Sequence, residues 1–161
     1  MANEYPFTAF NFQVLLTISN ASSLGLTSPL CNSEFAECDG LEMTMEPKTV
    51  REGGNNTQQI HLVGPVTYGN LTLKRGMTPS LDLWKWFSAA AGNEHRGTLA
   101  QGVVMMRNMR NSSTTLRFTL TDCLPIKIKA PAFNAKDGLV AIEEMQIAYS
   151  SFTVDLVSAE R

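Results

Sequence analysis

The strongest constraint on the fold is a repeated alternation of apolar and polar residues. In the first such stretch, Phe10, Phe12, Val14, Leu16 and Ile18 occupy every second position, with mostly polar residues between them. A period of two places these side chains on one face of an extended strand. Comparable stretches predict a mainly β fold, with strands at about 43–51, 57–63, 70–75, 99–109, 114–123, 126–129 and 140–156, the last one bent near 150–151.

A long hairpin is predicted around the sequence Gly53-Gly54-Asn55-Asn56, which is a concentrated turn signal. The alternating stretch from Met43 to Glu52 would extend about 33 Å at ~3.3 Å per residue, longer than the common strand of about 5–6 residues. The hairpin, at about 43–63, should therefore overhang a small domain as an arm. Few large apolar residues lie near its tip, so we expect it to gain order from a neighbouring copy; a mobile surface hairpin is the alternative.

One helix is predicted at about 79–91. Thr78 can cap its start, Pro79 suits the first helical position, and Gly92 suits a left-handed residue after the end. The helical spacing predicts an apolar face that covers one side of the sheet. That face would hold Leu83, Trp84, Phe87 and Ala91, with Leu81 and Trp86 on its flanks.

The length of the chain favours a single domain over residues 1–161. Charged residues make up 17% of the chain and the net charge is −2, so the sequence lacks the basic excess that tight nucleic-acid binding needs. No apolar run approaches a membrane span and no secretory signal is recognised, which predicts synthesis and folding in the cytosol. Cys31, Cys38 and Cys123 match no paired spacing and are expected to be buried free thiols.

The search for catalytic or metal-binding chemistry yields no signature, so we expect no enzyme, cofactor or metal site. His61 and His95 are interpreted as structural or solvated. Adjacent strand residues point to opposite faces, so Glu143 and Glu144 cannot converge on one substrate atom. The remaining candidates lack partners that the sequence places near them and are interpreted as solvated, ion-paired or turn residues: Lys74-Arg75, Lys127 and Lys129, Ser112-Ser113 and Ser150-Ser151.

Several short motifs occur together in a characteristic order. They are Phe35 to Glu42, Val50 to Asn56, Gly69 to Gly76 followed by Leu83-Trp84, and finally Phe133 to Lys136 with Val140 to Met145. In order and spacing they resemble the tail tube proteins of contractile phages and extracellular contractile injection systems. The resemblance spans roughly Phe7 to Leu156.

The resemblance implies a small antiparallel β-barrel or sandwich with one flanking helix, forming homo-hexameric rings that stack into a hollow tube. Its implied partners are a surrounding sheath, a baseplate with its spike, a tube cap, and a protein or DNA cargo in the lumen. Sheath contraction would drive the tube through a target envelope, without membrane insertion by this subunit. Carried over by position, the hairpin tip would contact an adjacent subunit or ring through Arg51, Glu52, Gly53, Gly54, Asn55 and Asn56.

Two other classes of function stay open at the level of sequence. A monomeric or dimeric β-barrel module could bind small ligands or sugars if Trp84, Trp86 and Phe87 lined a pocket, although their helical spacing favours a core. A hydrolase would need converging titratable groups that the sequence does not present.

Overall fold

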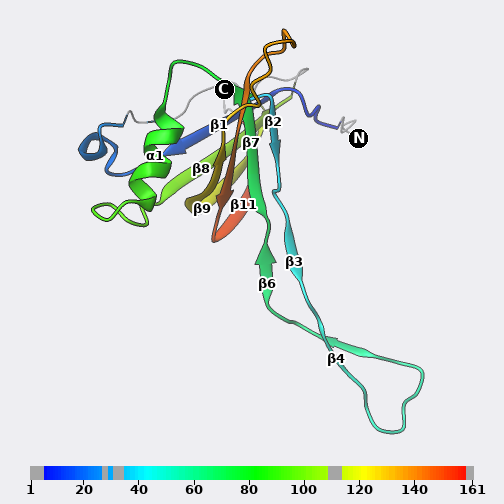
Figure 1. Cartoon of the computed structure of the whole chain (residues 1–161). Coiled ribbons are helices and arrows are strands. Elements are labelled where there is room, and N and C mark those ends of the chain that lie inside the picture. Colours follow the sequence, from blue (N-terminus) through cyan, green and yellow to red (C-terminus); the bar gives the residue numbers. More distant parts are fainter. Residues whose placement is uncertain (1–5, 27–28, 31–34, 109–113, 159–161) are drawn as a thin grey trace.

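The computed structural model describes residues 6–26, 29–30, 35–108 and 114–158, which form a β-rich body with a long projecting arm (Figure 1). The expectations for Cys31 and Ser112-Ser113 fall outside these residues. The elements are β1 (Phe12–Thr17), a 3-10 turn (Ala21–Leu24), β2 (Glu37–Asp39), β3 (Met43–Met45), β4 (Lys48–Val50), β5 (Ile60–Leu62), β6 (Val66–Tyr68), β7 (Asn70–Gly76), α1 (Asp82–Ala91), β8 (Ala100–Arg107), β9 (Thr114–Lys129), β10 (Ile142–Ala148) and β11 (Ser151–Ser158).

The body is an antiparallel sheet in the order β1-β8-β9-β10-β7-β2, with β11 also paired to β9. The predicted mainly β fold with a hairpin arm and a flanking helix is confirmed. Among the described strands the sheet does not close into a barrel, because β1 and β2 lie at its two ends and do not pair with each other.

The strand β9 joins the two halves of this sheet. Its first part pairs with β8 and β11, and its second part pairs with β10, so β9 and the β10–β11 segment form one bent ribbon. The predicted break between 123 and 126 is wrong, since the strand is continuous through Pro125. Pro125 is tolerated because the register of β10 against β9 shifts beside it, and proline is accepted at such irregularities. Asp122, with φ 52°, lies beside the bend.

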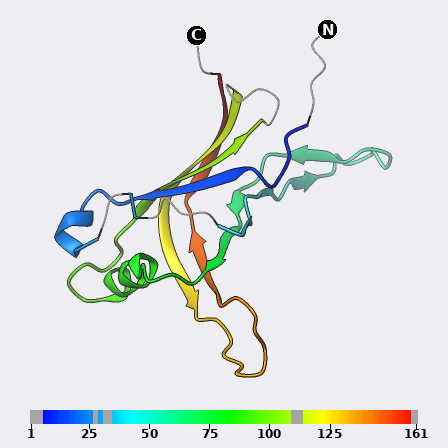
Figure 2. The same ribbon diagram turned by 90° about the horizontal axis from the view of Figure 1, so that it is seen from above.

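The core lies between the sheet halves and the helix. Its fully buried side chains include Leu16, Leu73, Leu120, Ile147 and Trp86. In the view from above, the helix lies against one side of the bent sheet and the arm leaves the body elsewhere (Figure 2). No helix in the described residues is long and apolar enough to cross a membrane.

The helix differs from its prediction in its start and in its face. It begins at Asp82, because the preceding segment is held outside the helix: the N–H of Met77 donates to the carbonyl of Ala141, and Arg75 donates to the carbonyl of Ser80. Neither Thr78 nor Pro79 therefore belongs to the first turn. The predicted left-handed Gly92 is also wrong, since its backbone is extended at φ −74° and ψ 169°.

The side chains that the helix buries are Leu83, Trp86 and Ala90. Trp86 is fully buried and its indole N–H donates to the carbonyl of Thr98, whereas Trp84 and Phe87 are only half-buried. The helix is thus rotated about its axis relative to the predicted face, and Ala91 is exposed.

Candidate assembly interface

The arm is a two-stranded ribbon in two sections that points away from the body (Figure 1). Near the body β3 pairs with β6, and further out β4 pairs with β5. The sequence predicts an arm that ends at residue 63. In the structure its returning strand is longer, because pairing resumes beyond Gly64-Pro65 and continues to Tyr68. Between the sections the outgoing side has two residues and the returning side has three, so the ribbon contains a register shift.

Nearly all arm side chains are exposed, including several large apolar ones. In the inner section, Met43 and Met45 lie across from Tyr68 and Val66. In the outer section, Val50 lies across from Ile60, and Leu62 pairs with Lys48. Residues directly opposite each other share a face of a ribbon. We call the exposed apolar group Val50, Ile60 and Leu62 the arm patch. A two-stranded ribbon is at best marginally stable alone, so contact with a partner at this surface would stabilise the arm.

The tip of the arm brings together the predicted contact residues in one tight turn. The N–H of Asn55 donates to the carbonyl of Glu52, and the side-chain oxygen of Asn55 accepts from the backbone and hydroxyl of Thr57. Arg51 and Glu52 are exposed, and in the described part of the chain neither forms an ion pair. Both charges are therefore available to another surface.

The two tip glycines differ in conformation. Gly54 has φ +95°, a region that side chains with a Cβ rarely adopt, whereas Gly53 does not have positive φ; both have open space where a Cβ would lie. The requirement for glycine therefore applies at Gly54 alone.

We expect Gly54→Val to impair the tube assembly that the resemblance implies, because a valine in this conformation costs about 1–3 kcal/mol of local strain and distorts the tip. Electron microscopy of purified protein would measure tube length. Gly53→Val is the matched control and should assemble normally. Wild-type tube length in the Gly54 variant would contradict a contact role for the tip.

The root of the arm is anchored by Tyr149, which directly follows β10. Its hydroxyl lies 2.8 Å from the carbonyl oxygen of Gly40 and accepts the N–H of Glu42 at 3.2 Å. The ring packs edge-on against Tyr68 and Phe152, with centroids 5.8 Å away in both cases. These contacts connect both strands of the arm to the body, so the direction of the arm is set by the body core.

A buried ion pair connects β7, β10 and the helix. The Arg75 guanidinium donates to the Glu143 carboxylate, whose other oxygen accepts the indole N–H of Trp84 at 2.8 Å. The side chains of Arg75 and Glu143 are each only 3% exposed, and Phe35 covers the guanidinium with its ring. The sequence does not pair these residues, and a role for Trp84 as a hydrogen-bond donor was missed.

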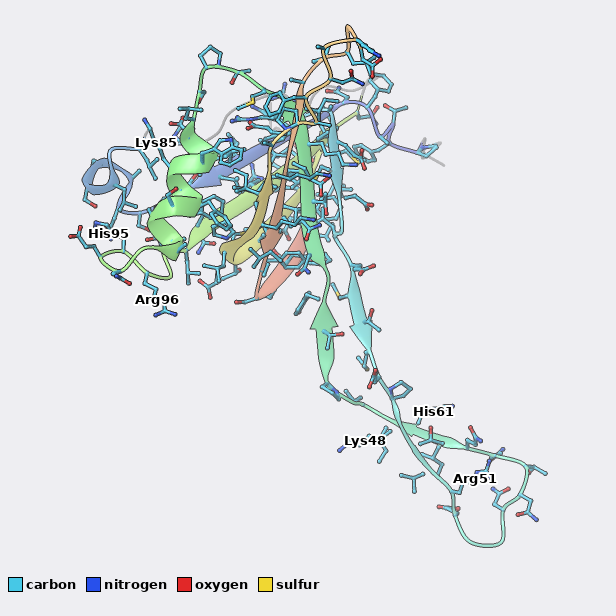
Figure 3. The ribbon with its side chains drawn as sticks, viewed as in Figure 1. Lys48, Arg51, His61, Lys85, His95 and Arg96 are labelled. Carbon is cyan, nitrogen blue, oxygen red and sulfur yellow. The ribbon has the colours of Figure 1, made fainter. Side chains whose placement is uncertain are left out.

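The other polar candidates do not converge on a common site. His61 lies on the arm with Lys48 and Arg51, far from Lys85 on the helix and from His95 and Arg96 in the loop after it (Figure 3). Lys74 forms an ion pair with Glu37 at 3.3 Å. Within the described residues, no three His, Cys, Asp or Glu side chains gather in a way that could hold a metal ion.

The two cysteines in the described residues are free thiols. Cys123 is buried, as expected, whereas Cys38 is only partly buried. Burial raises the pKa of Cys38 to about 12 and that of Cys123 to about 11. Both thiols therefore stay protonated and poorly nucleophilic near neutral pH.

Among the hollows lined by described residues, two bear on ligand binding. One, of about 210 Å³, is apolar and lies near the root of the arm, lined by residues that include Phe12, Leu41 and Phe118. The other, of about 420 Å³, lies in the loop between β9 and β10. Trp84, Trp86 and Phe87 line neither of them, so these hollows do not match the pocket that the ligand-binding alternative required.

The β body carries an exposed, partly apolar arm, and exposed apolar surface of this kind is typical of proteins that bind other proteins or further copies of themselves. Comparison with known protein families identifies the family to which the chain belongs. The family described as T4-like virus tail tube protein gp19 matches residues 8–153, so the chain belongs to this family of tail tube proteins.

Solved structures of contractile injection systems contain chains with the same fold. A chain of the anti-feeding prophage baseplate, solved with 6-fold symmetrisation, has 25% identity and a TM-score of 0.77, covering 94% of this chain and 97% of that one. A chain of the sheath-tube complex of the extracellular contractile injection system PVC has 17% identity and a TM-score of 0.75, with coverage of 96% and 95%. A search of curated protein sequences gave no match.

Proposed function

We propose that the chain is a single tube-protein domain, residues 1–161, whose copies form hexameric rings that stack into a hollow tube. The observation that carries this proposal is the arm: its apolar side chains lie outside the body core and are exposed in the single chain. That these copies form a tube is inferred from the membership of the chain in the tail tube protein family. The 6-fold symmetrisation of the similar anti-feeding prophage baseplate supports six copies per ring.

The proposed partners follow from the assemblies that contain similar chains. These are the anti-feeding prophage baseplate, the PVC sheath-tube complex and the cap that terminates the anti-feeding prophage tube. By analogy, this tube would contact a sheath, a baseplate with its spike and a cap, and would hold protein or DNA in its lumen. The subunit would be made in the bacterial cytoplasm and become part of a phage tail or a phage-tail-like particle.

The proposed mechanism is mechanical. Sheath contraction drives the assembled tube through a target envelope, and this subunit contributes rigidity and a channel, without catalysis, cofactor or membrane insertion of its own. We assign the polar contacts between subunits to Arg51 and Glu52. The turn formed by Gly53, Gly54, Asn55 and Asn56 holds these charges at the end of the arm.

Assembly is tested by negative-stain electron microscopy of the purified protein over a concentration series, with light-scattering mass measured in parallel. Rings or hollow rods that increase with concentration are the expected result, because association is driven by mass action. A mass that stays monomeric at all concentrations, with no rings, would contradict self-assembly and favour a ligand-binding module.

A further inference from the structure

A second exposed apolar surface lies on the body, at the loop between β9 and β10. Phe133, Leu139 and Val140 are 87%, 82% and 77% exposed. Met77 and Ile142 extend the surface, because the N–H of Met77 donates to the carbonyl of Ala141 at 2.9 Å and Ile142 pairs with Gly76. We call this group of five residues the loop surface.

The loop surface has the character of a contact site. Soluble monomers rarely expose contiguous apolar patches of this kind, and larger ones mark interaction sites. The loop is held in shape by the Asn134 side chain, which donates to the Asp137 carboxylate at 2.8 Å and accepts the N–H of Lys136 at 3.0 Å. Its hollow, of about 420 Å³, is lined mainly by apolar residues, among them Pro131, Phe133, Leu139 and Ile142.

The loop surface and the arm lie at different ends of the molecule. In Figure 1 the loop, in orange, extends from the end of the body opposite the arm, and in Figure 2 the two again point in different directions. A chain cannot bring its own arm to its own loop in this arrangement. Two different surfaces at separate ends are what a head-to-tail contact between identical copies requires, and repetition of such a contact extends an assembly.

The two surfaces also complement each other in chemistry. The arm patch offers Val50, Ile60 and Leu62, and beyond it the tip offers Arg51 and Glu52, which are adjacent and opposite in charge. The loop surface offers apolar side chains and a hollow, and beside them Lys136 and Asp137, again adjacent and opposite in charge. The apolar groups can pack together while Arg51 faces Asp137 and Glu52 faces Lys136.

We propose that the loop surface of one copy is the seat for the arm of a second copy, with the arm patch packed on Phe133, Leu139 and Val140. This inference rests on the proposed function, since it names the surface that receives the arm in the stacked tube. The apolar contacts supply the attraction and the two charge pairs set the orientation.

Crosslinking in trans tests the pairing directly. One chain carries Ile60→Cys and another carries Leu139→Cys; the two are mixed, allowed to assemble and treated with a flexible bismaleimide. A covalent dimer is expected from the mixture and not from either variant alone. Replacing the second chain by one carrying Leu156→Cys, at an exposed position on β11, is the control, and the chain without introduced cysteines gives the background.

A paired substitution tests the energetic role of the surface. Changing Leu139 and Val140 together to serine should raise the protein concentration needed for tubes by about tenfold or more, because serine removes most of the apolar surface that the arm would bury. Changing them to methionine and isoleucine keeps the apolar character and should preserve assembly. An unchanged unfolding curve shows that the body is intact.

The results of these experiments distinguish a failure of this inference from a failure of the proposed function. If the natural chain forms tubes but Ile60→Cys does not crosslink to Leu139→Cys above background, or crosslinks as well to Leu156→Cys, the loop surface is not the seat and the tube function stands. Tubes that form at the same concentration in the paired serine variant would also overturn it. If the natural chain never forms rings or tubes, the proposed function itself fails.

Discussion

Replacing Glu143 by alanine is expected to lower the free energy of unfolding by about 3–5 kcal/mol, because the substitution removes the carboxylate that compensates the buried Arg75 charge. The two side chains are each 3% exposed, so water cannot replace the lost carboxylate. Trp84 loses its hydrogen-bond acceptor in the same step. The change is measured by guanidinium unfolding, followed by circular dichroism, at protein concentrations too low for assembly.

The neighbouring Glu144 provides the matched control. It is only partly buried and lies across from Lys74 and Lys129 on the adjacent strands. Such cross-strand pairs contribute about 0.2–1 kcal/mol, so Glu144→Ala should have a small effect. Equal destabilisation by the two alanine variants would show that the Arg75–Glu143 pair is not the special contact that the geometry indicates.

Gly40→Ala is expected to cost at least about 2 kcal/mol and to impair assembly, because this glycine combines a strained backbone with a close approach. Its φ is +99°, and a Cβ at this position would lie 1.9 Å from the carbonyl oxygen of Asn70. The backbone at the root of the arm would have to move, and the hydrogen bond between Tyr149 and Gly40 would be disturbed. Unfolding curves and tube counts by electron microscopy measure the two effects.

Gly25→Ala is a control that separates the cost of a positive φ from the cost of a steric clash at the Cβ position. Gly25 also has positive φ, at +67°, but nothing lies within 4 Å of the position that a Cβ would take. Its substitution should cost only about 1 kcal/mol and leave assembly unchanged. If Gly40→Ala proved as mild as Gly25→Ala, the close packing of the arm root would have no energetic consequence.

The arm could be predicted from sequence because its signals are local. The turn residues at 53–56 and the alternation before them fix a hairpin without reference to the rest of the chain. Its full length could not be predicted, since Gly64 and Pro65 have the composition of a terminating turn. In the structure they occupy a register shift, and pairing continues to Tyr68 because the body holds both strands at the root.

The buried ion pair could not be predicted, because it joins residues that are far apart in the sequence. Arg75 and Glu143 are 68 positions apart, and alternation alone shows only that each lies on one face of its strand. The same limit applies to the helix. Its periodicity indicated an apolar face, but the choice between Trp84 and Trp86 as the buried indole depends on where the helix sits on the sheet.

The separation of the arm from the body core has a consequence for the accuracy of assembly. No residue between 43 and 66 is buried in the described structure, so the body does not need the arm in order to fold. A two-stranded arm without buried residues has little stability of its own, so we expect the entropy lost when the arm is fixed on a second copy to weaken each single engagement. A misplaced subunit held by one arm therefore dissociates before others join it, while a correctly placed subunit is retained by several contacts at once. Weak individual arms thus give a growing tube a means of correcting its own errors.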